Sequence, residues 1–144
     1  MTPPAEVPEA PPPRGPAVSG GETLLRVVPP KTAHSWMPGG VPSSALFNKP
    51  KFSAEREHLA DFAELAARWA GGNGIVAFGC QAARDLGFDA RDEPEPFKVD
   101  SPEINSAHAN VYCDLPEADR KRAARGLAAT CLNSIRRYPD PLPT

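Results

Sequence analysis

The chain has 144 residues, a formal charge of −2 and three cysteines. Its length fits one domain, and its charge gives no overall reason to expect nucleic acid or anionic lipid as a partner. No run reaches the roughly 18 apolar residues that a membrane-spanning helix needs. Three widely spaced cysteines favour reduced thiols in a cytoplasmic protein over a disulfide framework.

The first 21 residues, MTPPAEVPEAPPPRGPAVSGG, are predicted to form a disordered, proline-rich tail. Proline donates no backbone hydrogen bond, and the segment has few large apolar side chains whose burial could offset the entropy of ordering. It lacks the apolar run of a secretory signal. We therefore expect one α+β domain over residues 22–138 and a short C-terminal tail over residues 139–144.

The first half of that domain is expected to contain a strand, a loop and a helix. TLLRVV is rich in branched residues and is stopped by two prolines, which predicts a strand over residues 24–28. Residues 31–52 form a loop rich in Pro and Gly, with one helical turn or an edge strand at 45–48. A helix is predicted to begin at Ser53, a favourable cap, and to end at the glycines that follow residue 70. Its apolar stripe consists of Leu59, Phe62, Ala63, Ala66, Trp69 and Ala70.

The second half is expected to alternate strands and helices. Residues 75–78 form a strand and residues 80–86 a short helix that is closed by Gly87. An acidic connector follows over residues 88–105, with a short strand at 97–99 as one alternative. Residues 107–113 form a strand, and Asp114 and Glu117 cap a final helix. The stripe of that helix consists of Ala124, Leu127, Ala128, Cys131, Leu132 and Ile135. This order predicts a short, mostly antiparallel sheet covered by two or three helices.

His108 and Asn110 are candidate binding residues. Strand alternation places them on one face with Tyr112, opposite the small apolar side chains of residues 107, 109 and 111. An imidazole suits proton transfer or anion binding, but no partner stands at a diagnostic spacing. The alternative is a histidine that only bonds a loop carbonyl.

The loop GGVPSSALFNKPK is a candidate anion site, because small residues, two hydroxyls and two lysines can hold a phosphate. The residues concerned are Ser43, Ser44, Lys49 and Lys51. The loop lacks the spacing of a Walker motif, and its serines could instead cap local turns.

Cys80 is the best candidate for a reactive thiol, since it opens a helix whose free amides lower a thiol pKa. The alternative is a small buried side chain, as expected for Cys113 and Cys131. Neither cysteines nor histidines occur in the close pairs of a zinc site, so we expect no metal and no cofactor.

Charge is divided unevenly along the chain. Residues 81–104 carry seven acids and three bases, and residues 117–137 carry six bases and two acids. Either both are solvated surfaces, or the basic helix is a partner face formed by Arg120, Lys121 and Arg125. The same helix could contact nucleic acid phosphates, although it has no interleaved aromatic residues.

Three segments together, PSSALF…KPKFS, GIVAFGCQAARDLG and AHANV, resemble a family of small bacterial proteins that has no established activity. The resemblance covers about residues 24–137. It implies a bacterial cytoplasmic protein in which the serine loop and His108 lie near one another, and it transfers no catalytic residue. The family pattern has proline before its Ala-His-Ala, where this chain has Ser106.

The sequence therefore favours a small cytoplasmic, non-enzymatic binding or accessory protein that acts through a protein partner. It contains no complete catalytic set, and its proline-rich tail and divided charge suit a binding role. The alternative is a small enzyme, or a nucleotide- or anion-binding domain, whose site consists of Ser43, Ser44 and His108.

Overall fold

The computed structural model describes residues 13–28, 36–37, 41–60, 74–97, 100, 102–131 and 135–137. Within them, six strands form one antiparallel sheet in the order β10-β5-β1-β4-β9-β6. The strands are β1 (Thr23–Val28), β4 (Lys51–Arg56), β5 (Gly74–Gly79), β6 (Phe88–Asp92), β9 (His108–Cys113) and β10 (Ile135–Arg137).

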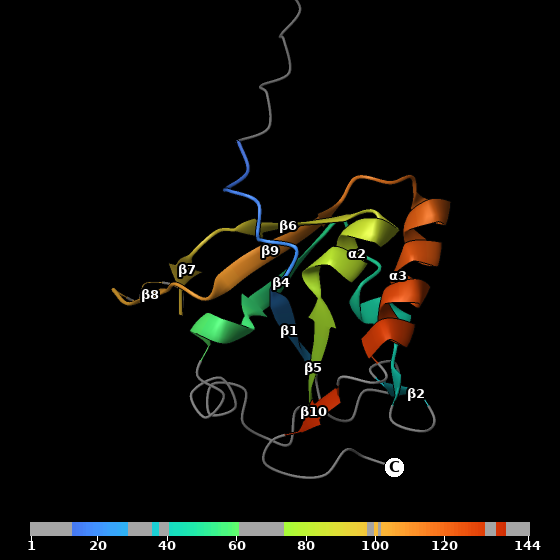
Figure 1. Ribbon diagram of the computed structural model, residues 1–144, viewed down its shortest axis with the longest axis horizontal. Helices are drawn as coiled ribbons and strands as arrows, with labels where there is room; N and C mark the ends of the chain where they lie inside the picture. The colour runs from blue at the N-terminus through green and yellow to red at the C-terminus, as the bar shows by residue number, and fades with distance from the viewer. Residues whose placement is uncertain are drawn as a thin grey trace, which may run out of the picture.

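Two α-helices, α2 (Cys80–Leu86) and α3 (Glu117–Cys131), lie side by side on one face of this sheet (Figure 1). Two small ribbons are separate from it. They consist of β2 (Trp36–Met37) with β3 (Val41–Pro42) and of β7 (Glu95–Pro96) with β8 (Ile104–Asn105). The β7–β8 ribbon projects from the side of the molecule away from α2 and α3 (Figure 1). Two 3₁₀ turns, η2 (Ser44–Leu46) and η3 (Glu57–Leu59), flank β4.

The main core lies between the sheet and the two helices. Its centre is the ring of Phe52, which packs edge-on against Phe47, Phe78 and Phe88 at centroid distances of 5.5, 6.3 and 5.9 Å. Such edge-to-face contacts stabilise beyond the area they bury. The helices add small side chains, mainly alanine and cysteine, so they approach the sheet closely.

Two glycines allow this close packing. Gly87 ends α2 with φ +110°, a conformation that favours glycine. Gly126 faces α2, where a Cβ would lie 2.9 Å from Leu86 Cδ2. The glycine that weakens α3 as an isolated helix therefore lets α3 approach α2.

The prediction of an α+β fold with an antiparallel sheet and helices on it is confirmed. The strands near residues 24–28, 75–78 and 107–113 were predicted correctly, as were α2 and the body of α3. The end of α3 differs, because Ile135 belongs to β10 rather than to the helix stripe. Leu132 lies outside the described residues.

The helix predicted to begin at Ser53 is wrong at its start. Residues 51–56 are β4, which pairs with β9 over five positions and with β1 over two. Phe52 and Ala54 are buried in the main core, while Ser53 points away, so the segment alternates as a strand does. Pairing on both sides satisfies the β4 backbone and outweighs the local preference for a helix. Residues 61–73, which hold the rest of the predicted stripe, lie outside the described residues.

Two other predictions need correction. The acidic connector contains a strand, β6, whose Phe88 and Ala90 are buried while Asp89 and Arg91, which alternate with them, are only partly buried. Of the tail predicted over residues 1–21, residues 13–21 are described, and Val18 among them is only 2% exposed, so this part is not disordered. The strand considered at 97–99 is not tested, since Lys98 and Val99 lie outside the described residues, as do residues 1–12 and 138–144.

We predict that Phe52→Ala lowers the free energy of unfolding by about 3–5 kcal/mol, because it empties the centre of the aromatic cluster. Urea denaturation followed by circular dichroism measures this. Ile104→Ala is the matched control, since its side chain is 55% exposed and its loss should cost less than about 0.5 kcal/mol. Similar costs for both variants would contradict the assignment of the core.

Candidate functional site

A cavity of about 500 Å³ opens where β1 and β4 stop pairing. The two strands are paired only at Leu24–Arg56 and Leu25–Glu55. Beyond these pairs β1 continues along β5, and β4 continues along β9. The residues next to the gap on both strands line the cavity, so it is a consequence of the sheet topology.

The cavity combines apolar walls with charged groups, and its size suits a small ligand or a few side chains of a partner. Its described apolar lining includes Leu25, Val27, Leu46, Pro96 and Phe97. Its described polar lining consists of Arg26, Lys49, Ser53, Glu55, Glu95, Asn105 and His108.

Arg26 is the central cation of this cavity. Its guanidinium donates from Nε and Nη2 to the Leu46 carbonyl, at 3.3 and 3.1 Å, and from Nη1 to the Ser53 carbonyl at 3.0 Å. It also lies over the ring of Phe52 at 4.9 Å. Burial lowers the pKa of Arg26 to about 10, so the group stays charged at neutral pH. One N–H on each terminal nitrogen has no acceptor, and no carboxylate pairs with this guanidinium, among the described residues.

The carboxylates of the cavity are held by other groups. Asn105 Nδ2 donates to Glu55 Oε1 at 2.8 Å, and Asn105 Oδ1 accepts from the Ala107 amide. Glu95 Oε2 lies 3.4 Å from His108 Nε2. The acidic end therefore has its own partners, whereas the guanidinium of Arg26 contacts two backbone carbonyls and the Phe52 ring and no carboxylate among the described residues.

His108 is oriented from both sides of its ring. Nδ1 lies 2.8 Å from the Glu93 carbonyl, and it carries the hydrogen, because a carbonyl oxygen can only accept. Nε2 is left facing Glu95 and the cavity. His108 is 9% exposed, is bonded to a loop carbonyl and lines the cavity, while its role in binding remains a prediction.

The cavity has opposite charges at its two ends. Arg26 donates to the Ser53 carbonyl of β4, and Lys49 is a second cation in the lining. Glu55 is two residues farther along β4, or roughly 6–7 Å away at the usual strand rise. This arrangement can hold an anionic group beside Arg26, with the apolar wall left for the rest of the ligand.

The other residues of the predicted site fall into separate places. Ser43 accepts from the Ala45 amide and caps η2, and Ser44 begins that turn. Both belong to the segment that packs against α3, and neither is among the cavity's described lining residues. Lys51 and Asn110 line a second pocket, of about 420 Å³, beside Glu93 and Tyr112. Lys49 and His108 thus line one pocket and Lys51 and Asn110 line another, while neither serine is in the described lining of these two pockets.

The basic residues of α3 are only partly available. Arg120 Nε donates to Asn48 Oδ1 at 3.1 Å and so fixes the loop after η2 to α3. Lys121 and Arg125 are exposed.

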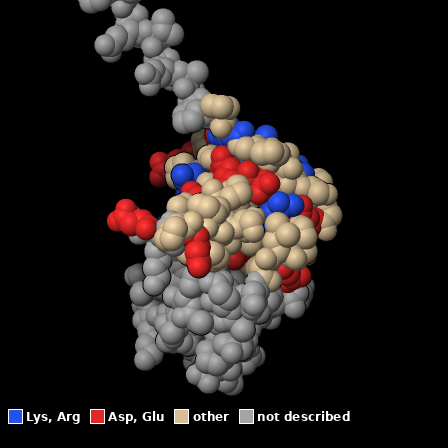
Figure 2. Space-filling view, turned by 90° about the vertical axis from the view of Figure 1, so that its left-hand side faces the viewer, with Lys and Arg blue, Asp and Glu red and all other residues tan. Residues whose placement is uncertain are grey.

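Figure 2 shows the side of the molecule from which the β7–β8 ribbon projects, where acidic side chains predominate.

All three cysteines are buried and unpaired. The expectation of a lowered thiol pKa at the start of α2 is wrong, because burial raises the pKa of Cys80. Its Sγ donates to the Val18 carbonyl at 3.7 Å. Burial also raises the pKa of Cys131, to about 12. These thiols act as core side chains.

Arg26, Glu95 and Asn105 belong to the site but were not found from the sequence. Arg26 has a recognisable signal, since it is the one charged residue within the apolar strand TLLRVV. Charge inside such a strand indicates a buried partner or a cavity. Glu95 and Asn105 have no such signal, because the β7–β8 ribbon that positions them is too short to be read from its sequence.

Comparisons with protein-family models, curated proteins and solved structures found no match. No helix in the described part of the chain is long and apolar enough to cross a membrane. Among the same residues, no group of three or more His, Cys, Asp or Glu side chains could hold a metal ion.

We predict that the phenol of Tyr112 titrates far above its ordinary pKa, because burial and the hydrogen bond to Glu93 raise its pKa to about 12. Glu93→Gln removes the negative charge that opposes phenolate formation, so the midpoint should fall toward 10 but stay above it, since burial is the larger cause. Near-ultraviolet absorbance measures this, and a Tyr112→Phe chain supplies the background of the second tyrosine. An unchanged midpoint in Glu93→Gln would contradict the contact.

Proposed function

We propose that this chain is a small non-enzymatic binding protein that takes an anionic group of its ligand into the cavity beside Arg26. The observation that carries the proposal is the guanidinium of Arg26, which is largely buried and has no carboxylate partner among the described residues. A buried charge is costly unless it is paired, and an anion from outside would supply the missing partner.

The state of the candidate catalytic groups supports binding rather than catalysis. His108 is held in place by the Glu93 carbonyl at Nδ1 and lies beside Glu95 at Nε2, and no cysteine is among the cavity's described lining residues. The thiols are buried, and burial raises the pKa of Cys80 and Cys131. The free thiols also suit a reducing compartment such as the cytoplasm.

The chemistry of the cavity favours a carboxylate or a phosphate attached to an apolar group. Guanidinium binds either anion with two parallel hydrogen bonds, and Arg26 retains one N–H on each terminal nitrogen. Leu25, Val27 and Phe97 provide an apolar wall. A protein partner would supply an acidic side chain, and a free molecule would supply its own anionic group.

Isothermal titration calorimetry with a short polyglutamate peptide and with inorganic phosphate tests the proposal and separates the two sources. We expect Arg26→Met to weaken binding about 10–100-fold, as for the loss of hydrogen bonds to a charged group. Lys49→Met should weaken it about threefold to tenfold, because that side chain is more exposed.

Lys121→Met is the matched control, because it removes the same charge from an exposed position on α3. Arg26→Met leaves the Leu46 and Ser53 carbonyls without their hydrogen-bond donor, which can destabilise the fold. Lys49→Met therefore provides a second test of the cavity that leaves these two bonds in place. Equal losses in Lys49→Met and Lys121→Met would indicate unspecific attraction of anions and contradict the proposal. So would the absence of binding by both probes to the natural, folded chain.

A further inference from the structure

Residues 14–18 occupy the outer edge of β6 as an added strand does. Ala17 forms an antiparallel bridge with Arg91. The Val18 amide donates to the Ala90 carbonyl at 3.0 Å, and the Asp92 amide donates to the Pro16 carbonyl at 2.8 Å. Since β6 is at the end of the sheet, these bonds satisfy an edge that would otherwise be open.

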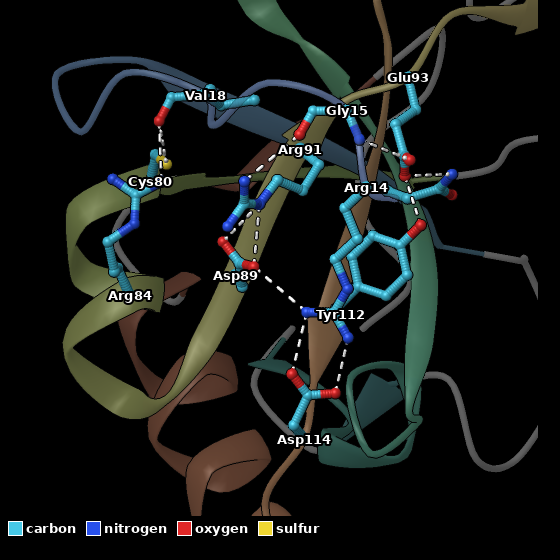
Figure 3. A network of polar contacts seen from close by, with 11 residues as sticks. Arg14, Gly15, Val18, Cys80, Arg84, Asp89, Arg91, Glu93, Tyr112 and Asp114 are labelled. Carbon is cyan, nitrogen blue, oxygen red and sulfur yellow. Dashed lines mark hydrogen bonds and ion pairs between the residues drawn. The ribbon is translucent and has the colours of Figure 1, made fainter. Parts of the chain in front are cut away.

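The first residue of this segment is held by an acidic and aromatic clamp (Figure 3). Arg14 donates to both oxygens of Asp114, at 2.7 and 2.9 Å, and to Asp89 at 3.2 Å. Its guanidinium also lies over the ring of Tyr112, 4.0 Å from the centroid. Planar stacking together with paired carboxylates distinguishes arginine from lysine.

The next residue has to be glycine. The Gly15 amide donates to Glu93 Oε2 at 3.1 Å. A Cβ at this position would lie 2.1 Å from the Asp92 carbonyl oxygen, which is backbone and cannot move aside. The groove therefore selects for the absence of a side chain at position 15 as well as for the charge at position 14.

The other end of the segment, Val18, is recognised through the burial of its side chain. Val18 is 2% exposed and packs in the main core. Its carbonyl accepts from Arg84 Nη2 at 2.8 Å, so α2 holds the segment at this end (Figure 3). Arginine, glycine and valine thus occupy three separate recognition points on one extended strand.

We propose that the β6 edge is a peptide-docking groove, and that its partner is an extended segment of another protein with an Arg-Gly pair followed three residues later by a valine-sized side chain. Such strand addition derives affinity from backbone bonds and specificity from side-chain pockets. Arg14–Val18 of this chain is the resident occupant, and the incoming segment displaces it. The groove is formed by residues other than those that line the cavity.

The resident segment is suited to displacement. Its ion pairs are partly exposed, with 31% of the Arg14 side chain and 72% of the Asp114 side chain accessible, and such pairs add little stability. Two glycines connect it to β1, and a side chain at Gly21 would meet nothing within 4 Å. Local opening of this edge therefore requires less free energy than unfolding of the sheet.

Fluorescence anisotropy with a labelled peptide of residues 13–21, PRGPAVSGG, tests the groove on the full chain. Arg14→Ala in the protein weakens the resident occupant, so the peptide should bind that variant at least about tenfold more tightly than the natural chain. The same substitution in the peptide should weaken its binding to both proteins by a similar factor. Arg14→Ala thus strengthens peptide binding when it is made in the protein and weakens it when it is made in the peptide. General charge attraction does not produce opposite effects of this kind.

A peptide with Gly15→Ala is the matched control, because its charge is unchanged and its Cβ collides with the β6 backbone. Gly15→Ala in the protein gives a second way to empty the groove if Arg14→Ala disturbs folding, which circular dichroism checks. Equal binding of the natural and Gly15→Ala peptides would overturn the proposal. So would failure of the natural peptide to bind both folded protein variants.

Discussion

β1 stops pairing with β4 after Leu25, and the guanidinium of Arg26 takes the place of the missing backbone bonds. It donates to a carbonyl of β4 and to the carbonyl of Leu46 at the end of η2, and it rests on the ring at the centre of the core. Where the backbone pairing of β1 and β4 ends, this side chain joins the two parts of the sheet. The cavity and the position of the 3₁₀ turn both follow from that division.

The same residue makes stability and binding interdependent. A guanidinium that meets only carbonyl dipoles retains part of the cost of its burial, and that cost appears in its lowered pKa. An anion that enters the cavity would reduce the cost. Because it would bind the folded chain and not the unfolded one, it would also stabilise the sheet at its weakest join.

The parts of the fold that could be predicted from the sequence are those with a local signal. Branched runs and alternation marked β1, β5 and β9, and Gly87 marked the end of α2. Residues 53–56 were predicted as a helix start because a serine followed by glutamates is typical of one. Pairing with β9 and β1 is what makes this segment a strand instead. For the site, the sequence indicated Lys49 and His108. It did not indicate Arg26, because the position of Arg26 in the cavity depends on the gap between β1 and β4, which are far apart in sequence.

Residues 93–97 connect the cavity to the β6 edge. The carboxylate of Glu93 accepts from the Gly15 amide, and its backbone carbonyl accepts from His108 Nδ1. Two residues later, Glu95 faces Nε2 of the same imidazole and lines the cavity. A strand on the β6 edge and a ligand in the cavity therefore act on one short segment from opposite sides. If both of them favour a particular position of this segment, the binding of each changes the affinity for the other by the same factor, because coupling between two binding equilibria is reciprocal.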